Sequence, residues 1–349
     1  MVVTPQNKTI GIMRMKALVY TQPNEVRIQE AESPVLAPDE VILKIDAVGI
    51  CGSDMHAYHG HDPRRKPGLV LGHEFAGTVV ESASPLFARG ARVTGNPLIT
   101  CGHCEYCRQG RNNLCANRTM VGMTRPGAFA EYMSIPASSL IAIPDDMTSD
   151  MAALTEPAAT AVHAIDLSVR ALRAPVSDAR VLVLGGGAIG MFTALLLKHR
   201  GVRAMEVAEI HDQRRASIAR EVGCGLINPR GETIPADAYD LVVDCVGSAV
   251  TRASAFSCIR PGGVIMHVGL QDWASEIDMR KLTLAEITLL GTYTYTTQDL
   301  HTTVDYLHHG VFGSCEWVDR RPLDQGPAAF QDLHHGRSAS AKILLKPFA

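Results

Sequence analysis

Short apolar runs separated by turn residues fill the chain from Met15 to about Pro144. The clearest runs are KALVY, VILKIDAVGI, AGTVVES and ARVTG, and Pro, Gly and Asp residues lie between them. Runs of this length bounded by turn residues are typical of β-strands. The pattern therefore predicts a β-rich unit over this part of the chain.

The pattern changes from about Met151 onward. Apolar runs now alternate with helix-like spacers: the runs are VLVLG, AMEVAEI, YDLVVDCVG and GGVIMHVGL, and the spacers include IGMFTALLLKHRG and HDQRRASIAREVG. Such alternation is typical of a parallel sheet covered by helices. After about Gly291 we expect a further helix in TTQDLHTTVDYLHHG and a closing strand in AKILLKP. The fold class is therefore α/β, with a doubly wound parallel-sheet domain in addition to the β-rich one.

Chain length and charge narrow the class of partner. At 349 residues the chain is longer than one hydrophobic core usually supports, which predicts two domains. A formal net charge of -3, with no lysine-arginine run, argues against nucleic acid and anionic membranes, so small ligands are the expected partners. The uncharged stretch from Val181 to Leu197 approaches the length of a membrane span, but its glycine cluster favours a strand, a turn and a buried helix. The N-terminal residues show no signal-peptide pattern, so we expect a cytoplasmic location.

A glycine motif lies in this uncharged stretch. VLVLGGGAIG places Gly185, Gly187 and Gly190 in G-x-G-x-x-G spacing, after an apolar run and before a helical one. In a dinucleotide-binding turn the first glycine permits the tight turn, the second lets the backbone approach the pyrophosphate, and the third lets helix and strand pack closely. Glu209 ends the next predicted strand, close to the distance at which an acidic residue meets the ribose hydroxyls. Together these features predict dinucleotide binding.

The same region bears on the choice between NAD and NADP. The carboxylate of Glu209 would repel the extra phosphate of NADP, which favours NAD. Arg214 and Arg215 follow closely, and their ordinary interpretation is a solvated helix face. An arginine near the ribose could instead accommodate that phosphate. We therefore expect NAD, and keep Arg214 as a candidate cofactor-binding residue.

Four cysteines fall within fifteen residues of the sequence CGHCEYCRQGRNNLC. Cys101, Cys104, Cys107 and Cys115 have the spacing C-x2-C-x2-C-x7-C. Disulfide scaffolds are short secreted chains, and nine cysteines, an odd number, in a reducing compartment indicate metal binding or chemistry. Four converging thiolates can hold a tetrahedral zinc that has no free position for a substrate, so a structural zinc is predicted. A redox dithiol or unpaired thiols are the alternatives, and neither the flanks nor the net charge support a nucleic-acid ribbon.

A second set of possible metal ligands is spread over three segments. Cys51 lies in GICGSDMH, His73 and Glu74 lie in LGHEFAG, and Glu156 lies in LTEPAAT. A thiol, an imidazole and a carboxylate can hold a zinc ion whose fourth position stays open, as a catalytic site requires. Each residue alone also suits an ordinary core position, so spacing by itself leaves this site open.

Seven motifs resemble those of a known family, in the family's order and over nearly the whole chain from Met15 to Pro347. They are VGICGSDMH, LGHEFAGTV, CGHCEYCRQGRNNLC, GAFAEY, TEPAATAVHA, VLVLGGGAIG and AKILLKP. The sequence resembles the zinc-dependent medium-chain dehydrogenases, and within them the sorbitol (polyol) dehydrogenase-like group. The resemblance implies a GroES-like catalytic domain over 1–155 with an N-terminal extension over 1–13, a Rossmann domain over 156–295, and a return to the catalytic domain over 296–349.

The resemblance also implies roles for the dispersed metal ligands. Cys51 and His73 match the family's catalytic zinc ligands, and Glu156 falls where the polyol group has a glutamate. Glu74 matches a carboxylate that is a ligand in some members and a near neighbour in others. Cys101, Cys104, Cys107 and Cys115 match the structural zinc site.

Further positions match the family's proton relay and cofactor site. Ser53 matches the hydroxyl that takes the substrate proton, His56 matches the relay toward solvent, and Asp54 resembles the carboxylate that orients His73. The positions that match cofactor-lining segments, besides the glycine turn and Glu209, are Ala188, Ile189, Thr160, Val268, Gly269, Leu270, Thr292 and Tyr293. One departure matters: sorbitol dehydrogenases carry an arginine where this chain has Thr294, which puts polyol preference in doubt.

The functional hypothesis is reversible hydride transfer between a secondary alcohol, polyol or sugar-derived, and NAD, with zinc as Lewis acid and Ser53 and His56 removing the proton. Two alternatives remain: a zinc dehydrogenase for a sugar acid, threonine or a diol, and a non-catalytic protein that binds nucleotide and zinc. By analogy with the family we expect a homo-oligomer, a dimer or a tetramer.

Overall fold

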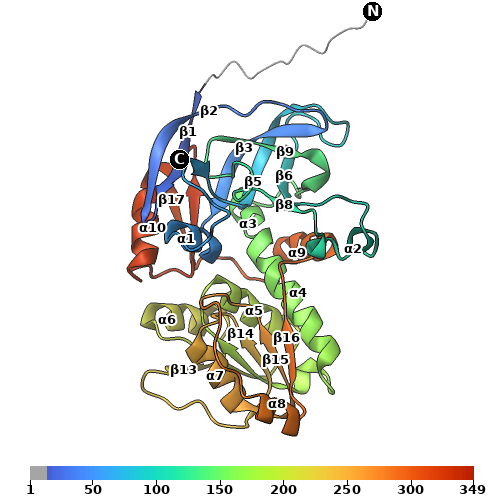
Figure 1. The fold of residues 1–349 in the computed structure, drawn as a ribbon, viewed down its shortest axis with the longest axis vertical. Coiled ribbons are helices and arrows are strands. Elements are labelled where there is room, and N and C mark those ends of the chain that lie inside the picture. The colour runs from blue at the N-terminus through green and yellow to red at the C-terminus, as the bar shows by residue number, and fades with distance from the viewer. Residues whose placement is uncertain (1–13) are drawn as a thin grey trace, which may run out of the picture. The chain divides into compact units, whose positions relative to one another are not determined.

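The computed structural model describes residues 14–349 and divides the chain into two compact units. Unit 1 contains the described residues up to Glu156 together with Val318–Ser338 and Lys342–Ala349, and unit 2 contains Pro157–Trp317 and Ala339–Ala341. The expected N-terminal extension over 1–13 lies outside the described residues. Figure 1 shows helices and arrows in both units, and the predicted α/β class is confirmed.

Unit 1 is built mainly from antiparallel strands. Its largest sheet has the order β10-β6-β5-β3-β18-β17, with β9 also paired to β3. A second sheet has the order β2-β1-β4, and β7 pairs with β8. The strand bounds are β1 Arg14–Gln22, β2 Glu25–Glu32, β3 Glu40–Gly49, β4 Leu69–Val70, β5 Glu74–Ser82, β6 Arg92–Gly95, β7 Leu98–Ile99, β8 Thr119–Met120, β9 Tyr132–Pro136, β10 Leu140–Ala142, β17 Val318–Pro322 and β18 Lys342–Lys346.

The short helices of unit 1 lie at strand ends and in loops. They are α1 Gly52–Tyr58, α2 Glu105–Arg108, α3 Ser149–Ala153 and α10 Gly326–His334, with single 3-10 turns η1 Asn112–Leu114, η2 Ala137–Ser139 and η4 Leu323–Gln325. One hydrophobic core joins the first and the last strand of the described residues, because Phe330, Ile343 and Leu345 pack with Leu18 and Leu43. The blue N-terminal and red C-terminal segments accordingly lie together in Figure 1.

Unit 2 has a parallel sheet with the strand order β13-β12-β11-β14-β15-β16. This is the 3-2-1-4-5-6 order of a doubly wound dinucleotide-binding fold, in which the order reverses beside the first strand, here β11. The strand bounds are β11 Arg180–Leu184, β12 Ala204–Ala208, β13 Gly225–Ile227, β14 Tyr239–Asp244, β15 Ile259–His267 and β16 Thr288–Gly291. The helices are α4 Thr155–Ala171, α5 Ala188–His199, α6 Asp212–Glu221, α7 Ala249–Cys258, α8 Met279–Leu284 and α9 Thr297–His308, and η3 spans Val176–Asp178.

The chain leaves unit 2 at Trp317, later than the expected boundary at 295. The apolar face of α9, formed by Leu300, Val304 and Leu307, is buried. Asp299 of the same helix pairs with His163 of α4, with 2.8 Å between its Oδ2 atom and the imidazole Nδ1 atom. The amphipathic spacing of a helix indicates that one of its faces packs on a core, but it does not indicate which of the two cores that is.

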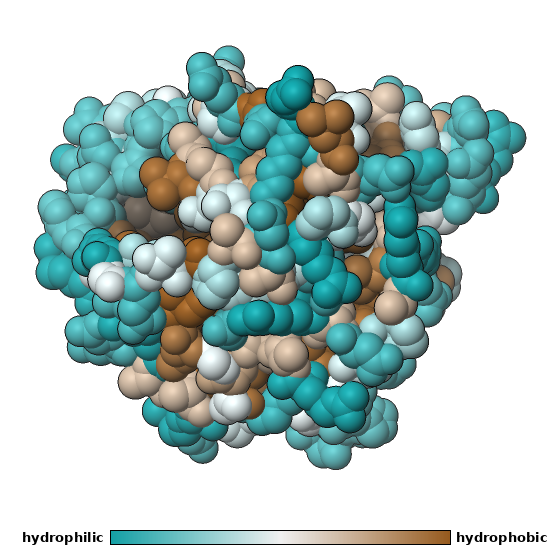
Figure 2. Space-filling view, turned by 90° about the horizontal axis from the view of Figure 1, so that it is seen from below, coloured by the Kyte–Doolittle hydropathy of each residue, from teal (hydrophilic) through white to brown (hydrophobic). Residues whose placement is uncertain are grey.

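The stretch from Val181 to Leu197 forms β11, the glycine turn and most of α5, as its glycines indicated. Among residues 14–349, no helix combines the length and the apolar character that a membrane crossing requires. Figure 2 shows one face of the molecule, where hydrophilic side chains surround smaller areas of apolar ones.

Candidate functional site

Cys51, His73 and Glu74 form one cluster in unit 1. One thiol, imidazole or carboxylate atom from each lies within 4.8 Å of the others. Cys51 caps the start of α1, His73 immediately precedes β5, and Glu74 is the first residue of β5. The strand register explains the meeting, because Gly49 at the end of β3 pairs with Glu74. These three donor types suit a zinc ion, so the residues fit the metal that the sequence predicts.

A glycine at position 49 is required by the carboxylate of Glu74. A Cβ atom added to Gly49 would lie 2.0 Å from Glu74 Oε2, well inside contact distance. Glu74 itself is fully buried. The absence of a side chain at position 49 thus makes the space in which this carboxylate lies.

Lys342 on β18 neutralises the buried carboxylate. Its ammonium group donates to Glu74 Oε1 at 2.6 Å, to Glu74 Oε2 at 2.7 Å and to the carbonyl oxygen of Ile50 at 3.0 Å. Burial lowers the pKa of Lys342, but Glu74, together with Cys51 and Glu156, raises it above the ordinary value. All three ammonium protons have acceptors, which a buried lysine requires.

Asp54 lies behind His73. Its Oδ1 atom is 3.5 Å from His73 Nδ1, and its Oδ2 atom accepts a hydrogen bond of 3.0 Å from the backbone N–H of Cys51. Burial raises the pKa of Asp54, but the His73 imidazole, Arg65 and the Cys51 N–H lower it below the ordinary value. A buried carboxylate in this place fixes the ring orientation of His73 and the loop that carries Cys51.

Ser53 faces the same imidazole from the first turn of α1. Its hydroxyl oxygen lies 3.5 Å from His73 Nε2. His56 follows three residues later, one helical turn further along α1. Burial lowers the pKa of His56, and the neighbouring His61 and Arg65 lower it further, against a smaller opposing effect of Asp62.

Arg65 is a residue that the sequence analysis did not single out. It is buried, and its guanidinium donates to Ser53 Oγ at 3.3 Å, to the carbonyl of Ser53 at 2.9 Å and to the carbonyl of Gly122 at 3.1 Å. It also pairs with Asp62 at 3.0 Å. In sequence Arg65 is part of the run RRK, which gives no sign that one of its members points inward.

Glu156, in the first turn of α4, is buried but does not belong to the cluster of three ligand atoms. Its charge nevertheless reaches Lys342 and helps to raise the pKa of that lysine. In this structure Glu74, held by Lys342, is the carboxylate beside Cys51 and His73.

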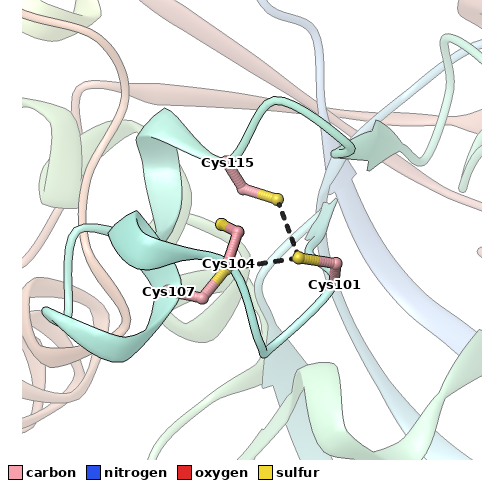
Figure 3. A group of neighbouring side chains, drawn as sticks. All are labelled: Cys101, Cys104, Cys107 and Cys115. Atoms are coloured by element: carbon pink, nitrogen blue, oxygen red, sulfur yellow. Dashed lines mark hydrogen bonds between the residues drawn. The ribbon is translucent and has the colours of Figure 1, made fainter.

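The four clustered cysteines converge from α2 and the loops that flank it, as Figure 3 shows. Their sulfur atoms all lie within 4.8 Å of one another, with Cys101 Sγ 3.5 Å from Cys115 Sγ and 4.0 Å from Cys107 Sγ. These separations are far longer than a disulfide bond, and all nine cysteines, which lie within the described residues, are free thiols. Four thiols in this arrangement fit a closed tetrahedral zinc site.

Two thiols of the cluster have pKa values that are shifted in opposite directions. Backbone hydrogen bonds from His103 and Cys104 lower the pKa of Cys101 to about 6. Burial, followed by the neighbouring thiols, raises the pKa of Cys107 to about 11. Cys101 therefore ionises more easily than a free cysteine, and Cys107 less easily. A bound cation would favour the thiolate form of all four cysteines.

In unit 2 the glycine turn has the geometry that dinucleotide binding needs. Gly185 has φ 93°, a conformation that residues with side chains rarely adopt. A Cβ atom on Gly190 would lie 1.9 Å from the carbonyl oxygen of Gly185, whereas one on Gly187 would meet nothing within 4 Å. The turn therefore packs tightly at its first and third glycines and leaves open backbone at the second, as a pyrophosphate requires.

Glu209 lies against this turn. Its carboxylate accepts hydrogen bonds of 2.7 Å from the backbone N–H groups of Gly186 and His211. Arg215 donates to the Glu209 carbonyl at 2.7 Å and pairs with Asp212, so it is engaged locally. The Nε atom of Arg214 is buried without a partner among the described residues.

Five of the other expected cofactor residues directly follow strand ends of the sheet. Val268, Gly269 and Leu270 follow β15, and Thr292 and Tyr293 follow β16, while Ala188 and Ile189 open α5 and Thr160 lies in α4. The carbonyl of Asp244, at the end of β14, accepts the N–H groups of Val268 and Gly269 at 2.9 Å. Thr294 has φ 48°, and its buried hydroxyl has no hydrogen-bond partner among residues 14–349.

The fold and these sites define a class of oxidoreductases with a GroES-like and a Rossmann domain, and comparison with known proteins agrees. Residues 37–145 match the family model for the alcohol dehydrogenase GroES-like domain, and residues 188–309 match that for zinc-binding dehydrogenase. The L-threonine 3-dehydrogenase of Chelativorans sp. (strain BNC1) is 35% identical over 80% of this chain and 83% of that protein. The chain belongs to the zinc-dependent medium-chain dehydrogenases and is an oxidoreductase, which removes the non-catalytic alternative.

Solved structures of similar proteins cover nearly the whole chain. A zinc-binding dehydrogenase from Sinorhizobium meliloti 1021, solved with NADP, has a TM-score of 0.86 at 30% identity and covers 96% of this chain and 99% of its own. The 2R,3R-butanediol dehydrogenase of Bacillus subtilis has a TM-score of 0.84 at 26% identity and covers 95% of this chain and 99% of its own.

The cysteine cluster gives the first prediction. We expect Cys101→Ser to lower the zinc content by one ion per chain and to destabilise the protein, because a closed thiolate site contributes directly to folding. Zinc analysis and denaturant unfolding would measure both effects. Cys224→Ser, which changes a half-buried thiol outside the cluster, is the matched control. Unchanged zinc content and stability in the Cys101 variant would rule out a structural metal there.

Proposed function

We propose that this chain oxidises a small secondary alcohol whose neighbouring carbon carries a second polar group, with NAD as the hydride acceptor. The observation that carries the proposal is the cluster of Cys51, His73 and Glu74, with the Ser53 hydroxyl 3.5 Å from the His73 ring. The relatives support the substrate class, since L-threonine and 2R,3R-butanediol both carry a polar group beside the secondary alcohol. The class includes the polyols and sugar acids that the sequence suggested.

The residues around the cluster have separate roles in metal binding and proton transfer. Cys51, His73 and a carboxylate would hold a zinc ion, which would supply the Lewis acidity that makes an alcohol easier to deprotonate, and a bound nicotinamide would supply the redox chemistry. Ser53 accepts the proton of the substrate hydroxyl and passes its own proton toward His56. Arg65 donates to Ser53 Oγ and so leaves the Ser53 proton free to be passed on. Because the pKa of His56 is lowered, this imidazole is neutral near pH 7 and can accept a proton.

A substrate panel tests the class directly. The panel contains L-threonine, 2R,3R-butanediol, sorbitol and the sugar acid L-idonate. We expect at least one of these compounds to be a substrate whose kcat/KM exceeds that of 2-propanol by a factor on the order of 10² or more. The reason is that a site built for a polar substituent leaves its own groups unpaired when the substituent is missing. The rate of NADH formation measures this ratio. If 2-propanol is used as well as the best member of the panel, the second polar group has no part in recognition.

Replacement of the proton acceptor separates chemistry from binding. Ser53→Ala should lower turnover by a factor on the order of 10² or more, while zinc content and NAD affinity stay near their original values. The exposed serine Ser138 of the same unit provides the matched control, Ser138→Ala. Should Ser53→Ala turn over at the original rate across the pH range, with metal and cofactor bound, the proton leaves by another route.

Cofactor preference follows from Glu209 beside the glycine turn. NAD should be preferred over NADP, and Glu209→Gln should narrow the preference, because it removes the charge that repels the extra phosphate but keeps an acceptor for the Gly186 N–H. The ratio of kcat/KM for the two cofactors is the measurement. A preference for NADP in the unchanged protein would assign cofactor choice to Arg214, whose Nε atom has no partner among the described residues.

A further inference from the structure

Histidines gather at the C-terminal ends of two helices of unit 1, outside the metal and cofactor sites described above. His59 caps the end of α1, and His61 follows it by two residues. His334 is the last residue of α10, and His335 caps that helix. His334 and His335 are exposed and His59 is half-buried, so the group borders on solvent.

The two helix ends meet through one pair of imidazoles. His59 Nε2 lies 2.9 Å from His334 Nδ1, and the ring centroids are 5.0 Å apart. The ring of His61 lies 5.7 Å from that of His59, and the ring of His335 lies 4.6 Å from that of His334. This separation fits a hydrogen bond in which the N–H of one ring donates to the unprotonated nitrogen of the other.

We propose that His59 and His334 form a binding site for one divalent late transition-metal ion, of the Ni²⁺ or Cu²⁺ type. Two nitrogens that each lie about 2.0–2.1 Å from an ion are separated by about 2.9 Å when they occupy neighbouring positions at right angles. In a tetrahedral site the separation is about 3.3 Å. The observed 2.9 Å between His59 Nε2 and His334 Nδ1 matches the right-angled arrangement, which Ni²⁺ and Cu²⁺ prefer.

Packing beneath the pair holds the two imidazoles in place. Tyr58, fully buried, has its ring 5.4 Å from that of Phe330 and 5.9 Å from that of His334. The side-chain amide of Gln331 donates a hydrogen bond of 2.7 Å to the Tyr58 hydroxyl. Because α1 and α10 are fixed to each other by these contacts, little further ordering is needed when an ion binds.

The electrostatic surroundings keep the imidazole of His59 in the neutral form that a metal requires. Burial lowers the pKa of His59, and the neighbouring His334, His61 and His56 lower it further. Waters or the nearby rings of His61 and His335 would complete the coordination. A bound ion would fasten the end of α1, the helix that carries Ser53 and His56, to α10.

Calorimetric titration of Ni²⁺ into the untagged, zinc-loaded full chain tests the site. We expect one Ni²⁺ to bind per chain without release of zinc, and paramagnetic broadening of the His59 and His334 ring signals in NMR spectra. His59→Asn and His334→Asn should each abolish the saturable binding. The double variant His308→Asn with His309→Asn, at the end of α9, is the matched control and should bind as the unchanged protein does.

Three results would overturn the proposal. One is the absence of saturable Ni²⁺ binding, and another is binding that survives both His59→Asn and His334→Asn. The third is Ni²⁺ uptake equal to the zinc released, which would show exchange at the zinc sites instead of a separate site.

Discussion

The buried ion pair between Lys342 and Glu74 is the interaction on which the arrangement of unit 1 depends. A carboxylate with no exposure carries a large desolvation penalty, which only a well-placed partner offsets. That partner comes from β18, whose Leu344 pairs with Gly49 of β3, while Gly49 pairs with Glu74 of β5. Removal of one member of such a pair typically costs about 3–5 kcal/mol, because the other charge stays buried alone. The return of the chain end to unit 1 is thus tied to the place where Cys51 and His73 meet.

The candidate sites of the two units depend on different backbone geometry. In unit 1, strands that pair antiparallel bring segments from distant parts of the sequence to one strand end, and buried charges such as Asp54 and Arg65 hold the donors and the Ser53 hydroxyl in place. In unit 2, the order of the parallel strands reverses beside β11, and glycines leave the backbone there without side chains. Metal chemistry depends on the first arrangement and cofactor binding on the second.

Local patterns predicted the features that depend on neighbouring residues. The glycine turn and the four-cysteine cluster could be predicted because their members lie within a few residues of one another. The alternation of strand-like and helix-like segments predicted the fold class. The partner of Glu74 was not readable, because Lys342 lies 268 residues away and nothing nearby marks it as buried. The role of Arg65 was not predictable, because a charged run on the surface and an arginine that points inward have the same sequence. The pairing of His59 with His334 was not predictable either, because only the packing of strands and helices brings these two residues together. The place of α9 was likewise not predictable, because amphipathic spacing does not say which core a helix joins.

The zinc content and stability of a Lys342→Met variant show whether the ion pair between Lys342 and Glu74 holds the site together, with Lys342→Arg as the control that keeps the positive charge. We expect the methionine variant to keep the zinc of the cysteine cluster and to unfold at lower denaturant concentration, because the Glu74 charge is left buried without its partner. It should also lose the zinc held by Cys51 and His73, because Lys342 no longer holds the Glu74 carboxylate in its place beside them. The arginine variant should lose less of both. If the methionine variant keeps both zinc ions and the original stability, this ion pair does not hold the site together.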